Sequence, residues 1–145
     1  MINYKLLTPG PLTTTKTVKQ EMLVDHCTWD NDYKIITQRI RAELLDLAHV
    51  SPEEYTAVLM QGSGTFGVES AITCSVGHAG KVLILSNGAY GERQEDICKH
   101  AGVSYRIQHF HYNEIPDAKV VEKILSEDSS ITHVSMVHKN RISKN

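Results

Sequence analysis

Apolar residues recur at steps of three and four in the stretch that follows Asp30, whereas charged residues lie mostly off this stripe. Its members are Tyr33, Ile36, Ile40, Leu44 and Leu47. This spacing predicts an amphipathic helix, which Asp30 or Asn31 can cap and which ends before Ser51-Pro52. An N-terminal arm and a short helix around Val18 and Met22 are expected before it.

After residue 54 the pattern changes to short apolar runs separated by helical segments. The runs predict four strands, at residues 55–60, 81–85, 103–110 and 131–137. Helices are predicted in the three intervals, over about 65–77, over 92–101 and after Pro116. Strands that alternate with helices indicate βαβ units. We therefore predict an α/β fold, namely a three-layer, mainly parallel sheet with helices on both faces.

Composition fits one globular domain, with 145 residues, 41% of them apolar and 22% charged. A net charge of -2 gives no field that favours nucleic acid or a membrane surface, so neither partner is expected. Cys27, Cys74 and Cys98 are far apart and form no CxxC pair, which is typical of reduced thiols. No signal-peptide pattern and no apolar run of about 20 residues is present. We expect a cytoplasmic protein.

Glycines and hydroxyls gather at Gln61-Gly62-Ser63-Gly64-Thr65, between a predicted strand and a predicted helix. Free N–H groups and the dipole of a helix start attract an anion, and a phosphate is the obvious ligand. A tight turn in which Ser63 or Thr65 is a simple N-cap explains the same residues without a ligand. Gly62-x-Gly64-x-x-Gly67 also matches a dinucleotide fingerprint, although the next strand ends without the acid that holds the ribose. An NAD- or phosphate-binding domain stays an alternative.

A second motif, Asn87-Gly88-Ala89-Tyr90-Gly91-Glu92-Arg93, follows the carboxyl end of the strand at 81–85. Open α/β sheets bind ligands at that edge. Tyr90 can lay its ring over a flat cofactor or pack against the sheet. His109 and His111 share one face of a strand, but the spacing places no third ligand beside them, so no metal site is predicted.

Three segments together resemble the class V branch of fold-type I aminotransferases. They are residues 6–12, Gly62-Ser63-Gly64-Thr65 and the motif at 87–93, and their order and spacing match. The residue sequences LLTPGPLTTT and NGAYGER resemble those of the 2-aminoethylphosphonate–pyruvate transaminases in particular. The resemblance runs over residues 1–138, which we assign to the N-terminal part of the aminotransferase large domain.

The resemblance implies a parent enzyme that binds pyridoxal 5'-phosphate as a Schiff base with a lysine. Ser63, Gly64 and Thr65 would hold the cofactor phosphate, and Tyr90 would stack on the pyridine ring. The arm Thr8-Pro9-Gly10 would lie near the substrate. The amino group of 2-aminoethylphosphonate would pass to the cofactor, giving phosphonoacetaldehyde, and then to pyruvate, giving alanine. The parent would be a homodimer that serves phosphonate catabolism.

The end of the sequence departs from this family pattern. Residues 139–145, KNRISKN, are expected to be a basic tail outside it. In the family the aspartate at the pyridinium nitrogen, the Schiff-base lysine and the carboxylate-binding arginine come later. No lysine of this chain matches the catalytic position, so no catalytic residue is assigned and we expect a truncated chain that is inactive alone. A non-catalytic fragment that pairs with a full-length copy is a further alternative.

Overall fold

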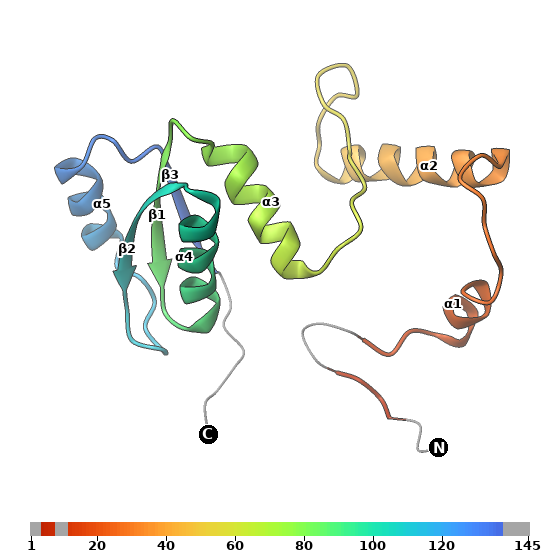
Figure 1. The fold of residues 1–145 in the computed structure, drawn as a ribbon, viewed down its shortest axis with the longest axis horizontal. Coiled ribbons are helices and arrows are strands. Elements are labelled where there is room, and N and C mark those ends of the chain that lie inside the picture. The colour runs from red at the N-terminus through yellow and green to blue at the C-terminus, as the bar shows by residue number, and fades with distance from the viewer. Residues whose placement is uncertain (1–3, 8–11, 138–145) are drawn as a thin grey trace. The chain divides into compact units, whose positions relative to one another are not determined.

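The computed structural model describes residues 4–7 and 12–137 (Figure 1). The chain divides into two compact units, Met1–Gly62 and Ser63–Asn145. The first unit contains the helices α1 (Lys16–Glu21) and α2 (Asn31–Leu47). The second contains α3 (Gly64–Val76), β1 (Lys81–Ser86), α4 (Ala89–Ala101), β2 (Ser104–His109), α5 (Ala118–Glu127) and β3 (His133–Met136).

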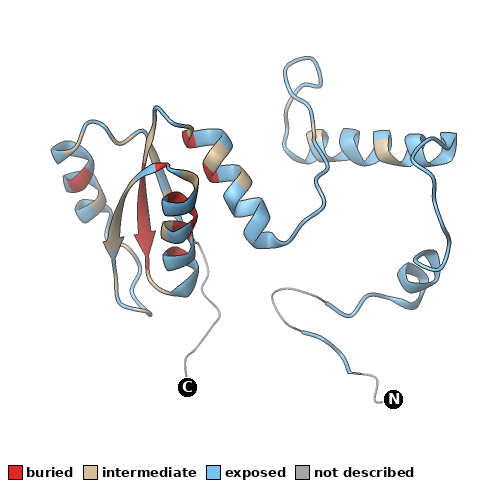
Figure 2. Cartoon of the chain, viewed as in Figure 1, coloured by how far each residue is buried: buried red, intermediate tan, exposed pale blue. Residues whose placement is uncertain are grey.

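Both helices of the first unit form where the sequence predicts them, yet neither contains a buried residue. The hydroxyl of Thr15 accepts a hydrogen bond from the backbone N–H of Val18, at 3.4 Å, and caps α1. The apolar stripe of α2 is largely exposed, as the pale blue of Figure 2 indicates. These two helices therefore form where the local spacing of apolar residues predicts them, although none of their residues is buried.

The predicted strand at 55–60 is wrong, because the structure contains no strand there. The segment is mostly exposed, with Val58 73% accessible. Arg41 of α2 holds it in place: its Nε donates to the carbonyl of Ala57 at 2.8 Å and its Nη2 donates to the hydroxyl of Thr56 at 2.6 Å. Apolar character alone does not make a strand, which also needs a neighbouring strand to satisfy its backbone groups.

The other three predicted strands form one sheet in the order β2-β1-β3. Both pairings are parallel, and β1 is central, with Leu83 opposite Arg106 on one side and Val134 on the other. Its sequence KVLILS is apolar on both faces, which is typical of a strand covered on both sides. The predicted parallel α/β fold is confirmed.

Helices cover both faces of the sheet, so the predicted three layers are present (Figure 2). On one face Val82 and Ile84 of β1 pack with residues of α3 and α4 and with the residue that precedes β2, namely Ile72, Val76, Ile97, Cys98 and Val103. On the other face Leu83 and Leu85 pack against Ile124 of α5. Each such side chain contributes roughly 1.5–3 kcal/mol of burial free energy. Because successive side chains of a strand point to opposite faces, β1 contributes to a hydrophobic core on each face of the sheet.

Candidate functional site

The parallel sheet gathers the carboxyl ends of its strands at one edge, and α4 starts there directly after β1. Helix α3 ends at Val76, shortly before β1 begins, so its N-terminal end points toward the same end of the sheet (Figure 1). The two predicted ligand-binding motifs are therefore the starts of two helices that share one end of this unit. That is the edge at which open α/β sheets bind ligands.

Helix α3 begins with a capped and open N-terminus. The Oγ of Ser63 accepts a hydrogen bond from the backbone N–H of Phe66, at 3.2 Å, and its carbonyl accepts from Gly67 at 3.0 Å. The N–H groups of the next two residues, Gly64 and Thr65, have no acceptor within a helix. No acidic residue lies in this first turn, and nothing lies within 4 Å of a Cβ built on Gly64. An anion can therefore reach these donors.

Helix α4 begins in a tight junction that glycines make possible. Gly88 is the N-cap with φ 151°, a backbone conformation that side-chain-bearing residues rarely adopt. A Cβ on Gly91 would lie 2.5 Å from Ser86 Oγ and 2.7 Å from Ser86 Cα, so the first turn presses directly on the end of β1. Tyr90 lies in this turn and is 40% accessible. The ring is thus available to a ligand rather than buried in the core.

A cavity of about 260 Å³ opens beside this junction. Its lining residues are Ser86, Asn87, Gly88, Glu92, His109, Phe110, His111 and Tyr112. The loop after β2 is joined to this junction by one hydrogen bond, in which the side-chain amide of Asn87 donates to the carbonyl of Glu114 at 3.3 Å. Within the loop, the N–H of His111 donates to the Glu114 carboxylate at 2.9 Å. Among residues 4–7 and 12–137 no group of three or more His, Cys, Asp and Glu could hold a metal ion.

Of the predicted site residues, Ser63, Gly64 and Thr65 lie together at the start of α3, and Tyr90 lies in the first turn of α4. The first half of α3 is exposed, because this helix packs through Ile72 and Val76 near its other end. The cavity is lined by neither Tyr90 nor the α3 start. The predicted substrate arm, Thr8-Pro9-Gly10, lies outside the described residues.

Two residues of this edge were assigned no role in the sequence analysis. Ser86 and Gly91 set how closely α4 approaches β1, with Ser86 only 1% accessible. Phe110, the residue after β2, donates a hydrogen bond from its backbone N–H to the carbonyl of Ser86, at 2.8 Å. The sequence feature that could have indicated this close approach is the second glycine of NGAYG, because a glycine inside a helix often marks a tight packing contact.

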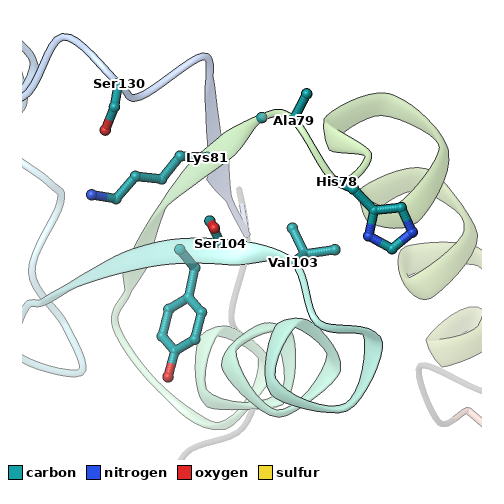
Figure 3. Close-up of a pocket in the computed structure, with 8 residues that line it drawn as sticks. His78, Ala79, Lys81, Val103, Ser104 and Ser130 are labelled. Atoms are coloured by element: carbon teal, nitrogen blue, oxygen red, sulfur yellow. The ribbon is translucent and has the colours of Figure 1, made fainter.

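A second cavity, of about 520 Å³, opens at the amino ends of β1 and β2 (Figure 3). Figure 3 shows Lys81 and His78 extending to opposite sides of this opening. Lys81 Nζ forms an ion pair with Asp128 at 2.7 Å. Hydrogen bonds from Lys81 and Ser130 lower the pKa of the Asp128 carboxyl from its usual 3.8 to about 2. This cavity contains none of the predicted site residues.

Solved structures show what class of fold this arrangement belongs to. The pyridoxamine–pyruvate aminotransferase of Mesorhizobium loti matches 90% of this chain with a TM-score of 0.73 and 22% identity, over 33% of its own length. The ureidoglycine–glyoxylate aminotransferase of Bacillus subtilis matches 92% with a TM-score of 0.74 and 18% identity, over 34% of its length. The chain therefore has the fold of part of an aminotransferase.

Sequence relatives narrow this class. The chain is 57% identical over 138 residues to the 2-aminoethylphosphonate–pyruvate transaminase of Lysinibacillus sphaericus, which covers 95% of the chain and 38% of the relative. It is 48% identical over 136 residues to a bifunctional phosphonoacetaldehyde hydrolase/aminoethylphosphonate transaminase of Clostridioides difficile, over 94% of the chain and 21% of the relative. No family model matches the chain. The resemblance to 2-aminoethylphosphonate–pyruvate transaminases is thus confirmed, for a chain that spans between a fifth and two fifths of these relatives.

Proposed function

We propose that this chain supplies the cofactor-phosphate end of a pyridoxal-phosphate-dependent 2-aminoethylphosphonate–pyruvate aminotransferase. The whole enzyme would convert 2-aminoethylphosphonate and pyruvate to phosphonoacetaldehyde and alanine. The observation that carries this proposal is the 57% identity across 95% of the chain to a transaminase of that name. We further propose that residues 1–138 are part of its large domain, that the enzyme is a homodimer and that it is cytoplasmic, as its scattered free cysteines indicate.

The start of α3 fits the phosphate of such a cofactor. Gly64 leaves open space above the first turn, and Ser63 caps the helix without an acidic neighbour. The Ser63 hydroxyl already accepts from Phe66, so its own proton can be donated to a phosphate oxygen. Two free backbone N–H groups and the positive end of the helix dipole add to it. We propose Ser63, Gly64 and Thr65 as the phosphate ligands.

The accessible ring of Tyr90 fits the second part of the cofactor. It belongs to the first turn of α4, whose approach to β1 is fixed by the contact between Gly91 and Ser86. A rigidly placed aromatic ring can cover one face of a planar heterocycle and exclude water from it. When bound, pyridoxal phosphate supplies the electron sink for amino transfer. The residues of this chain would bind and orient it, while the arm Thr8-Pro9-Gly10 is proposed for the substrate side.

The NAD-binding alternative lacks the local structure that its fingerprint needs. Gly62-x-Gly64-x-x-Gly67 should follow a strand, but residues 55–60 form none. The strand β1 also ends at Ser86 and continues into Asn87 without an acid for a ribose. We therefore favour the phosphate of an aminotransferase cofactor over a dinucleotide.

A binding measurement with pyridoxamine 5'-phosphate tests the assignment, because this form lacks the aldehyde and cannot couple to surface lysines. Isothermal titration of the chain should give weaker binding for pyridoxamine, which lacks the phosphate. Ser63→Ala should weaken pyridoxamine phosphate binding by about tenfold or more, since a hydrogen bond to a charged group contributes roughly 1.5–3 kcal/mol. Asp117→Ala is the matched control, because it removes the N-cap of α5 in the same unit.

Tyr90 is tested by a pair of substitutions in the same assay. Tyr90→Phe keeps an aromatic face and should preserve binding, whereas Tyr90→Leu should weaken it. Equal affinity for pyridoxamine with and without its phosphate would refute the α3 assignment. Equal losses of pyridoxamine phosphate affinity in Ser63→Ala and Asp117→Ala would show that Ser63 acts only as a helix cap. Binding of NAD that pyridoxamine phosphate does not displace would support the dinucleotide alternative.

A further inference from the structure

The Asn87-Gly88 step joins β1 to α4 at the carboxyl edge of the sheet. We propose that this step is a site of spontaneous deamidation in the folded protein, which converts Asn87 to aspartate or isoaspartate. The modification does not depend on the proposed aminotransferase function. Only the effect of the modification on cofactor binding by Tyr90 rests on that proposed function.

The chemistry needs water and no catalyst. The backbone nitrogen of Gly88 attacks the side-chain carbonyl carbon of Asn87, a C–N bond forms, and ammonia leaves. Water then opens the resulting five-membered imide at either carbonyl, giving aspartate or isoaspartate. Glycine is the residue that hinders the attacking nitrogen least, since it has no Cβ and the widest backbone freedom.

Three features of the fold favour this reaction at Asn87. The residue is partly accessible and lines the cavity of about 260 Å³, so water can reach its amide. Gly88 contributes its carbonyl to α4, accepting from the N–H groups of Gly91 at 2.9 Å and Glu92 at 3.2 Å. Its nitrogen precedes the helix and is not part of that ladder. His109 and the carboxylate of Glu92 line the same cavity and can accept the proton that the Gly88 nitrogen loses.

The product alters the junction in two ways. The Asn87 amide donates to the carbonyl of Glu114 at 3.3 Å, and a carboxylate in its place removes that donor and faces the carbonyl oxygen. Isoaspartate also adds one methylene to the main chain between β1 and α4. Because the first turn of α4 presses on Ser86, this extra length must displace the turn that carries Tyr90.

One tryptic digest tests the proposal with internal controls. Cleavage after Lys and Arg gives peptides 20–34, 82–93 and 107–119, which contain Asn31, Asn87 and Asn113 as their single asparagines. The folded chain is incubated in mildly alkaline buffer made with heavy-oxygen water, and oxygen uptake at each peptide is followed by mass spectrometry. Peptide 82–93 should incorporate the label several-fold faster than either of the others and should give two products. Asn87→Gln should lose this fast phase, because glutamine would have to form a larger ring.

Fragmentation of the labelled peptide should place the new oxygen on residue 87. The same incubation of the urea-unfolded chain separates the turn in the folded protein from the dipeptide itself. Labelling of peptide 82–93 no faster than that of 20–34 and 107–119 in the folded chain overturns the proposal. Labelling that occurs only after unfolding also overturns it, since the folded junction would then protect Asn87.

Discussion

Replacing Gly91 by alanine places a methyl group where the first turn of α4 meets the end of β1. The new Cβ would lie 2.5 Å from Ser86 Oγ, 2.6 Å from Ser86 Cβ and 2.7 Å from Ser86 Cα. The first of these atoms belongs to a small side chain, but the last is backbone of the central strand β1, at a residue that is only 1% accessible. Neither the strand nor the helix can yield without disturbing the core, because interiors are close-packed.

The cost follows from the chemistry of overpacking. Extra methyl groups forced into a packed site destabilise by about 1–3 kcal/mol, and alanine recovers roughly 0.5–1 kcal/mol of helix propensity over glycine. The net loss should therefore be about 0–2.5 kcal/mol, and the contact with strand backbone places it toward the upper end of that range. Urea unfolding of the chain, followed by circular dichroism, measures it as a lower midpoint with an unchanged slope.

Gly67→Ala is the matched control, since Gly67 lies inside α3 and nothing lies within 4 Å of its Cβ position. It should stabilise the chain slightly by helix propensity alone. Ser86→Gly should restore part of the loss in the Gly91→Ala background, because it removes two of the three crowding atoms. A Gly91→Ala chain as stable as the Gly67→Ala chain would refute the close-contact reasoning, and so would the absence of any rescue.

Two further predictions concern titratable groups. Asp128 has its pKa lowered to about 2 by hydrogen bonds from Lys81 and Ser130, so its stabilising effect is complete above its ordinary value of 3.8 and is lost as the pH falls toward about 2. Acid unfolding of Asp128→Asn, compared with the unchanged chain, should lack that part of the pH dependence, and identical profiles would contradict it. Burial raises the pKa of the Cys98 thiol, and the nearby Glu95 adds to the rise. A thiol-specific reagent at neutral pH should therefore label the exposed Cys27 and Cys74 first and Cys98 only on unfolding, whereas equal labelling rates in the folded chain would contradict this.

The site residues were accessible to sequence reasoning only where their roles are local. Ser63 is an N-cap because its hydroxyl precedes a helical stretch by the right number of residues, and no distant contact is involved. Gly91 is different, since its importance comes from Ser86 on a separate element, and the sequence carries no measure of that approach. The cavity beside Asn87 likewise depends on a loop more than twenty residues away.

The helices, their apolar faces and capping hydroxyls, and the order of the elements from residue 63 onward were determined by the sequence itself, because periods of two and 3.6 act over a few neighbouring residues. The tertiary structure decided which apolar runs became strands. The run at 81–86 is a central strand because β2 and β3 pair with it, whereas the equally apolar run at 55–60 has no such partner among the described residues and is held instead by Arg41. Backbone hydrogen bonds of a sheet join residues that are distant in sequence, so pairing is settled only when the chain folds.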